Sequence, residues 1–225
     1  MSPSTRLRLW GLVARRQPSA FLLAAQLLSL ALYPLMVDSH GGRLVFGAVA
    51  LVVVPLAVWV VNRSPAYNWI AWLIAIPAVL LTLAGVLLER PELLTVSATL
   101  EATLYFYAAG GLIAYMMRDV KVGADELYAA GATFTLLAWG FAYAFYVCQA
   151  WYPSSFTGFD PGRPRLWIEL LSLSFTNLSA VGLGDVVPVA APARVLVMLE
   201  QFAGVGYIAT VVSRLIGLTI ANQRD

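Results

Sequence analysis

A short loop near the middle of the C-terminal half has the composition of a cation-coordinating segment. Between Ser179 and Asp185, the two glycines Gly182 and Gly184 alternate with larger residues. Glycine adopts left-handed backbone conformations at little steric cost, so this alternation lets successive carbonyl groups point to one side. A column of carbonyl oxygens can replace the water shell of a small cation. Asp185 adds negative charge at one end of the loop.

The residues before this loop predict a helix that is too short to cross a bilayer. A helix rises 1.5 Å per residue, so about 20 apolar residues are needed to cross the hydrocarbon. The stretch Leu166–Leu178 is shorter than this and too apolar for an exposed loop. We therefore expect a re-entrant helix whose negative C-terminal end faces the cation, with Thr176 and Ser179 supporting the loop.

The composition places the whole chain in a membrane. Of its 225 residues, 60% are hydrophobic and 12% are charged, and the mean hydropathy is +0.79. A soluble domain carries about 25% charged residues, because charges cover its water-facing surface. The net charge of +2 and the lack of a basic run with interleaved aromatics argue against nucleic acid as a partner. Membrane lipids are the surroundings we expect.

Six segments are long and apolar enough to be transmembrane helices. The sequence therefore predicts an all-α integral membrane fold, with the re-entrant helix and its loop between the fifth and sixth spans. The predicted spans are Ala20–Val37, Leu44–Val61, Trp69–Leu88, Leu93–Met117, Ala130–Tyr152 and Ala193–Ile220.

The distribution of Lys and Arg predicts the orientation of these spans. Nine of the fourteen basic residues fall in the termini and the even-numbered loops, and five fall on the opposite side. Cytoplasmic loops carry the excess of positive charge, so we expect a multi-pass protein of the cell membrane with both termini in the cytoplasm. The compact loops and the short tail favour a bacterial inner membrane and no cytosolic ligand-binding domain on this chain.

The loop and its flanking spans resemble the tetrameric potassium-channel family. The filter of that family reads Thr-Val-Gly-Tyr-Gly-Asp, or Thr-Ile-Gly-Leu-Gly-Asp in some pore repeats of two-pore-domain channels. The segment Ala180–Asp185 matches this pattern at five positions when Leu183 is allowed. The preceding Ser-Phe-Thr-x-Leu-Ser, the later proline, and Gly204 at the position of the inner-helix hinge glycine also match. The resemblance covers residues 130–218.

This resemblance implies a potassium-selective channel that assembles as a homotetramer, because one loop cannot surround an ion. It implies no cofactor other than the permeant K⁺ ions, and no enzymatic activity. Gly204 and Gly206 are the implied hinge of the last helix. The carbonyls implied to bind K⁺ are those of Ala180, Val181, Gly182 and Leu183, with Gly184 and Asp185 completing the outer end of the filter.

The polar segment Arg118–Leu127 separates four predicted N-terminal spans from a C-terminal unit, and the chain is expected to have four regions. Residues 1–19 are a basic interfacial segment, 20–117 a four-helix membrane domain, 118–129 a cytoplasmic linker and 130–222 a pore domain. The fourth span contains no Lys or Arg. Voltage sensing needs charge inside the membrane field, so we expect no arginine-based voltage sensor.

Two acids fall within predicted spans, Glu101 in the fourth and Glu200 in the last. A carboxylate inside a membrane costs about 2.5–3.5 kcal/mol on insertion scales, so it needs a partner or a task. For Glu200 we expect a hydrogen bond to the back of the pore helix, at Thr176 or Asn177, and proton sensing is the alternative. For Glu101 we expect a protonated side chain that is hydrogen-bonded between helices.

Departures from the family pattern leave a second function open. Ala180 replaces a threonine whose hydroxyl helps to form the innermost ion site, and Leu183 replaces a tyrosine that hydrogen-bonds behind the filter. A weakly selective cation channel of the same architecture is therefore the nearest alternative.

Two further alternatives come from other classes of protein. Intramembrane aspartyl proteases carry a Gly-x-Gly-Asp motif, which Gly182–Asp185 fits, but they need a second facing aspartate. A transporter is expected to contain paired broken helices in two halves, whereas this sequence has one interruption.

Overall fold

The structure is a computed structural model that describes residues 17–37, 55, 68–118, 123–160 and 162–222. Its short strands β1 (Phe156–Thr157) and β2 (Val187–Pro188) pair antiparallel. The predicted second span, Leu44–Val61, lies outside the described residues apart from residue 55. The described helices are α2 (Pro18–Val37), α4 (Asn68–Leu87), α5 (Pro91–Arg118), α6 (Ala124–Trp151), α7 (Trp167–Leu178), α8 (Ala191–Tyr207), the π-helical segment η1 (Ile208–Val212) and α9 (Ser213–Asn222).

The helices have the lengths and composition of membrane helices. Three described segments are long and apolar enough to cross a bilayer, namely Trp69–Leu87, Ala124–Trp151 and Ala191–Ile220. Two other predicted spans coincide with the helices α2 and α5. Apart from the two short strands, the described part of the chain is a helical membrane protein, and the number of six spans stays a prediction.

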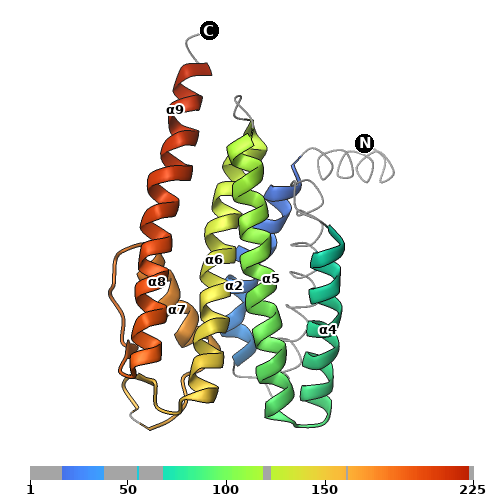
Figure 1. Cartoon of the computed structure of the whole chain (residues 1–225), viewed down its shortest axis with the longest axis vertical. Helices are drawn as coiled ribbons and strands as arrows, with labels where there is room; N and C mark the ends of the chain where they lie inside the picture. Colours follow the sequence, from blue (N-terminus) through green and yellow to red (C-terminus); the bar gives the residue numbers. More distant parts are fainter. Residues whose placement is uncertain (1–16, 38–54, 56–67, 119–122, 161, 223–225) are drawn as a thin grey trace.

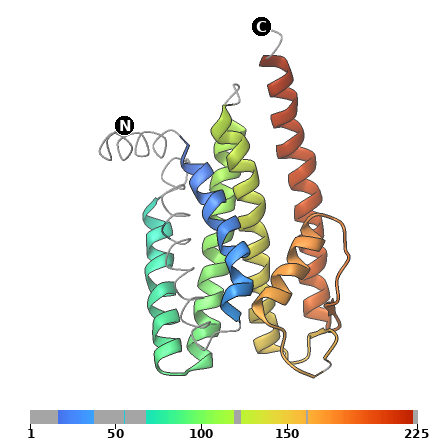
Figure 2. The same cartoon turned by 180° about the vertical axis from the view of Figure 1, so that it is seen from behind.

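The helices α5 and α6 run antiparallel through the centre of the described structure (Figure 1). The helix α4 packs against α5, and α2 packs against α6. The short helix α7 lies between α6 and α8, and the opposite view displays its position beside both helices (Figure 2). The first residues of α2 and the end of α9 lie at the same end of the bundle. This arrangement is compatible with an even number of membrane-spanning helices.

The N-terminus of α2 is tied to the first turn of α6. The backbone N–H of Ser19 donates to Asp125 Oδ1 and its hydroxyl donates to Asp125 Oδ2, both over 3.1 Å. The first N–H groups of a helix have no partner inside the helix, so a carboxylate at this place stabilises the helix end. α6 itself begins at Ala124, six residues before the predicted fifth span.

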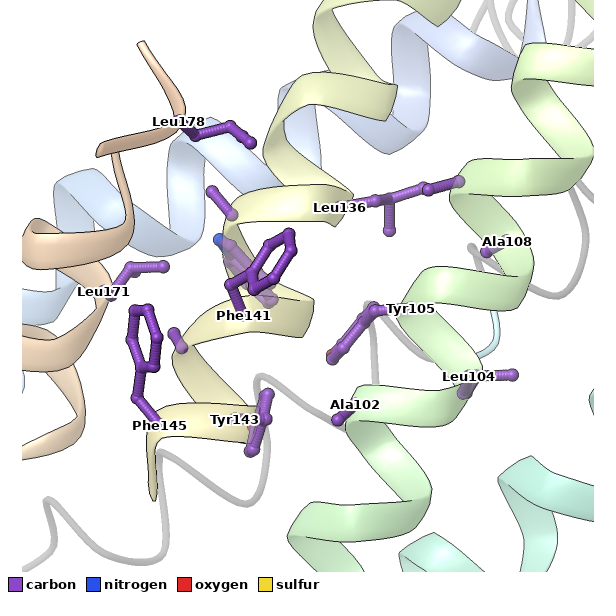
Figure 3. Packing of buried hydrophobic residues seen from close by; sticks show 14 of the residues in the cluster. Ala102, Leu104, Tyr105, Ala108, Leu136, Phe141, Tyr143, Phe145, Leu171 and Leu178 are labelled. Atoms are coloured by element: carbon purple, nitrogen blue, oxygen red, sulfur yellow. The ribbon is translucent and has the colours of Figure 1, made fainter. Parts of the chain in front are cut away.

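The core lies on both sides of α6. Figure 3 shows Leu136 and Tyr105 between α6 and α5, and Leu171 on the side of α7. A connected set of aromatic rings crosses this core: Tyr105 lies 5.7 Å from Trp139, and Trp139 lies 5.5 Å from Trp167. Tyr105 belongs to α5, Trp139 to α6 and Trp167 to the first turn of α7. The rings therefore connect the N-terminal helices with the short helix before the loop.

Candidate functional site

The helix α7 ends where the glycine-containing loop begins. Its first turn is closed by Glu169, whose carboxylate accepts the backbone N–H of Leu166 over 2.6 Å. Its last residue is Leu178, so it covers the predicted short helix almost to the residue. The unpaired carbonyl groups of its last turn carry partial negative charge, and they lie beside the loop.

The start of the loop is held by hydrogen bonds to the last turn of α7. The N–H of Ala180 donates to Asn177 O over 3.0 Å, and the N–H groups of Val181 and Gly182 both donate to Thr176 O over 2.9 Å. None of the described peptide bonds is cis, and a trans peptide places its N–H and C=O on opposite sides. The carbonyls of the three preceding peptides, at Ser179, Ala180 and Val181, therefore point away from α7.

The backbone of the loop alternates in conformation, as the glycine spacing predicts, but over different residues. Positive φ angles occur at Ala180 (59°) and Gly182 (66°), whereas Gly184 has no positive φ. A residue with a side chain is uncommon in this left-handed region. The hydrogen bonds to Thr176 and Asn177 compensate for the strain at Ala180.

The loop is exposed along one side of the single chain. Val181 is 59% exposed and Leu183 is 75% exposed, although both are large apolar side chains. On α8, Phe202 is 81% exposed, and Met198 and Leu199 are also exposed. So many exposed apolar side chains are unusual on an isolated protein, and they indicate that other molecules cover this surface.

The end of the loop that is farther from α7 along the chain is braced by the two-stranded sheet. Phe156 pairs with Pro188 and Thr157 pairs with Val187, so the chain after α6 is joined to the chain after the loop. The hydrogen bond from Val189 N to Ser155 O, 2.9 Å long, extends this contact. Asp185 lies just before β2 and is exposed.

A buried arginine organises the segment between β1 and α7. Arg165 is 3% exposed, and its guanidinium donates to the backbone oxygens of Arg163 and Asp160. Its own backbone exchanges two hydrogen bonds with the side-chain amide of Gln149, of 2.6 and 3.0 Å. On the surface, Arg163 bonds to Asp160 and Glu169, and the hydrogen bond with Asp160 raises the pKa of Arg163. The segment is thus anchored to the end of α6.

Three contacts between α7 and α8 fix the position of one helix along the other. Glu200 Oε1 is hydrogen-bonded to the hydroxyl of Ser174, and Gln201 Nε2 donates to Asn177 Oδ1 over 3.1 Å. At the third contact, the carbonyl oxygen of Leu178 lies so close to Gly204 that an added Cβ would be 2.0 Å from it. The end of α7, and with it the start of the loop, is therefore fixed to α8.

The predicted hydrogen bond from Glu200 to the short helix α7 is present, but with a different partner. It reaches Ser174, not Thr176 or Asn177. Thr176 is unsuitable because its hydroxyl donates to Leu173 O, and Asn177 is bonded to Gln201. The residues that the sequence interpretation missed are therefore Ser174 and Gln201. The sequence feature that could have indicated these two residues is the spacing of polar residues on the faces of two otherwise apolar helices.

Glu101 lies among hydroxyl groups of α4 and α5. Its Oε1 is 2.9 Å from Thr82 Oγ1 and 3.2 Å from Ser97 Oγ, and the two hydroxyl oxygens are 2.5 Å apart. The side chain is 4% exposed. The expected hydrogen bonds between helices are therefore present, and Glu101 is remote from the loop in the chain fold.

The two glycines of the last helix differ in their surroundings. Gly204 is α-helical and in close contact with Leu178, whereas a Cβ at Gly206 would meet nothing within 4 Å. The helix departs from regular geometry two residues after Gly206, in the π-helical turn Ile208–Val212. Bending at Gly204 and Gly206 stays a prediction.

The side chains offer no metal centre of the usual kind. Within the described ranges, no group of three or more His, Cys, Asp or Glu side chains is close enough to hold a metal ion. The carbonyl oxygens that point away from α7 are the groups available to a cation. Oxygen ligands without a charged cage suit a weakly bound, easily released ion.

These features define a class of protein before any relative is considered. Long apolar helices, a short helix between two of them, and an exposed loop with outward-pointing carbonyls are the parts of a membrane protein that passes ions. The family model described as "ion channel" matches residues 102–220, which is more than half of the chain. The chain therefore belongs to this ion channel family. No curated protein and no solved structure matches it.

Proposed function

We propose that the chain is a potassium-selective channel in which the carbonyls of Ala180–Leu183 replace the hydration shell of K⁺. The observation that carries this proposal is the direction of the loop amides. The N–H groups of Ala180, Val181 and Gly182 donate to the backbone oxygens of Asn177 and Thr176, so the carbonyls of Ser179, Ala180 and Val181 point away from α7 and are free to coordinate an ion. In the proposal, the carbonyls of Gly182 and Leu183 extend this column. The helix α7 then acts as a re-entrant pore helix whose C-terminal end faces the ion path.

Four copies of the chain form the pore in this proposal. One loop contributes a single column of oxygens, and a closed ring of four such columns surrounds the ion. The exposed side chains of Val181, Leu183 and Phe202 support this arrangement, because neighbouring subunits would cover them. Gly204, Gly206 and the π-helical turn are placed along the inner helix below the filter.

The membrane topology of the proposal has six spans and cytoplasmic termini. It is supported by the excess of Lys and Arg on one side. Within α5 the basic residue is Arg118, at the last position of the helix. The four N-terminal spans are then a scaffold or a sensor of another kind, and the channel is not gated by arginines that move in the field.

A weakly selective cation channel is the second candidate, and it rests on two specific residues. Ala180 offers no hydroxyl to the innermost site, and the 75% exposed Leu183 offers no hydroxyl behind the filter. The aspartyl protease alternative needs a second aspartate facing Asp185. Of the other described aspartates, Asp125 bonds to Ser19 and Asp160 bonds to Arg163.

The proposal is tested with purified protein in liposomes, by comparing K⁺ and Na⁺ fluxes under opposite gradients. We expect a flux that favours K⁺. Gly182→Ala is the matched variant, because Gly182 has a φ of 66° with open space around it. The added methyl group strains the backbone without a clash, so the flux should vanish while the protein still folds. Equal K⁺ and Na⁺ fluxes would favour the second candidate, and no flux would contradict both.

A further inference from the structure

Glu200 belongs to a hydrogen-bond chain that joins three helices behind the loop. Its Oε1 is bonded to the hydroxyl of Ser174 on α7, and the same hydroxyl is 2.8 Å from the carbonyl oxygen of Ala138 on α6. Glu200 and Ser174 are both 0% exposed. The second carboxyl oxygen of Glu200, Oε2, has no hydrogen-bond partner in the part of the chain that is described.

The number of protons available to these hydrogen bonds determines whether Glu200 is ionised or neutral. The hydroxyl of Ser174 has one proton, and it makes two short oxygen–oxygen contacts. A backbone carbonyl and a carboxylate are both acceptors only. With an ionised Glu200, one of the two contacts would hold no proton and would be repulsive. A neutral Glu200 supplies the missing proton: it donates to Ser174, and Ser174 donates to Ala138.

Among the residues that the structure describes, no charged group is paired with Glu200. Its one hydrogen bond among the described residues goes to Ser174, and none of the described salt bridges includes it. An unpaired charge at this depth is costly. Arg194, on the same helix, bonds to Pro188 at the outer end. The other ionisable residues on the elements packed around α8 are Glu169 on α7, Tyr207 on α8 itself, and Asp125, Glu126, Tyr128, Tyr143, Tyr146 and Cys148 on α6.

The contact acts on the loop through the last turn of α7. Ser174 lies one helical turn before Asn177 and Leu178, and Thr176 and Asn177 accept the three N–H groups of the loop. A shift of α7 along α8 would move these acceptors and turn the loop carbonyls. Ser174 bonds to both α6 and α8, so it fixes the position of α7 between them.

We infer that Glu200 is a positioning residue for the filter. Its neutral carboxylic acid donates a hydrogen bond to Ser174, and this bond fixes α7 between α6 and α8. The functional readout of this inference rests on the proposed channel function. The inference predicts that the amide of glutamine can replace the carboxylic acid, because it also donates a hydrogen bond to Ser174. A charge at residue 200 is not required.

The first test compares Glu200→Gln, Glu200→Leu and Ser174→Ala by the ratio of K⁺ to Na⁺ flux in liposomes between pH 6 and 8. We expect Glu200→Gln to keep the wild-type ratio and its flat pH profile. Glu200→Leu and Ser174→Ala should each lower the ratio about tenfold, the effect of one lost buried hydrogen bond. Loss of selectivity in Glu200→Gln, or full selectivity in both other variants, would overturn the inference.

The second test detects the proton directly and does not depend on ion flux. A neutral carboxylic acid has a carbonyl stretch that is well separated from the stretches of a carboxylate. We expect the infrared difference spectrum between wild type and Glu200→Gln to contain this band at neutral pH. Glu92→Gln, which changes an exposed acid, should show only the loss of carboxylate bands and serves as the control.

The outcomes separate this inference from the proposed function. Carboxylate bands in place of the neutral band in the Glu200→Gln difference spectrum would contradict the inference even in a selective channel. Wild-type protein without selective K⁺ flux would contradict the proposed function, while the infrared result would still decide the state of Glu200. If Glu200→Leu does not fold, Ser174→Ala and the infrared comparison decide the question.

Discussion

The N-terminal helices and the helices around the loop each bury one glutamate, and they hold it in different ways. Glu101 bonds to Thr82 and Ser97, and both hydroxyls also contact the carbonyl oxygen of Ala78, over 3.0 and 2.8 Å. These groups belong to α4 and α5, which follow each other in the chain, and Tyr143 of α6 lies beside the same carboxyl group. Glu200 instead connects α8 with α7 and, through Ser174, with α6, so that one hydroxyl group joins three helices.

The difference indicates two tasks for the same kind of side chain. The helices α4 and α5 are already held together by a short connection and a long packed interface, so the bonds of Glu101 add stability to an arrangement that other contacts determine. The helix α7 is short and carries an irregular loop, and few contacts fix its position along α8. The bonds of Glu200 therefore determine geometry, and the two sites should respond differently to mutation.

The largest expected effect comes from one added methyl group, at Gly204 in the contact between α7 and α8. Gly204→Ala places a Cβ about 2.0 Å from the carbonyl oxygen of Leu178, so α7 and α8 must move apart. We expect a loss of about 3 kcal/mol in the free energy of unfolding, typical of a severely overpacked core, and loss of K⁺ flux. Unfolding in mixed micelles and liposome flux measure the two effects.

Gly110→Ala in α5 is the matched control for this comparison. Gly110 is exposed and helical, and a Cβ there meets nothing within 4 Å. Alanine favours the helix by about 1 kcal/mol in general, so the variant should be at least as stable as wild type and conduct normally. A channel that tolerates Gly204→Ala as well as Gly110→Ala would contradict the close contact between α7 and α8.

The second prediction concerns Glu101, whose loss should change stability and leave selectivity unchanged. Glu101→Leu removes the hydrogen bonds to Thr82 and Ser97 and leaves their hydroxyls with fewer partners. We expect the free energy of unfolding to fall by about 1–3 kcal/mol, with the wild-type ratio of K⁺ to Na⁺ flux. Glu101→Gln, whose amide oxygen can still accept from Thr82 and Ser97, should recover most of this loss. A changed flux ratio in Glu101→Leu would remove the distinction between the two glutamates.

A third prediction concerns the contact between α7 and α8. Gln201→Leu removes the 3.1 Å hydrogen bond to Asn177 but leaves the Glu200–Ser174 bond in place. Because Asn177 keeps its bond to Leu173 O, the cost should be about 1 kcal/mol, with a smaller drop in selectivity than in Glu200→Leu. Flux ratios of both variants, measured in parallel, give the order; the reverse order would make Gln201 the main anchor of α7.

The smallest expected effect lies where the two regions meet, between the end of α5 and the start of α9. The guanidinium of Arg214 on α9 donates to the carbonyl oxygen of Met116, in the last turn of α5, over 2.6 Å. A cation at a helix C-terminus stabilises it by about 0.3–1 kcal/mol. Arg214→Gln should therefore raise amide hydrogen exchange in the last turn of α5 and the first turn of α9 and leave exchange in α7 unchanged. Equal exchange in wild type and variant would show that this contact contributes nothing.

Much of the architecture follows from local composition, because length and apolarity alone decide whether a helix can lie in a membrane. The segments of α2, α4, α5 and α8–α9 were within a few residues of their predicted limits, and the short helix α7 was predicted from its length. The start of α6 was placed too late, since the polar residues Asp125 and Glu126 were assigned to a linker. Their carboxylates in fact close the ends of α2 and α6.

The sequence by itself determined that this is a membrane protein with a glycine-containing loop after a short helix, because hydrophobicity and the conformational freedom of glycine are properties of single residues. Only the tertiary structure decided which polar groups meet. In the structure, Glu200 bonds to Ser174, a positive φ angle occurs at Ala180 and not at Gly184, and Gly204 contacts Leu178. Such choices depend on how far one helix is shifted along another, and no local pattern encodes that distance.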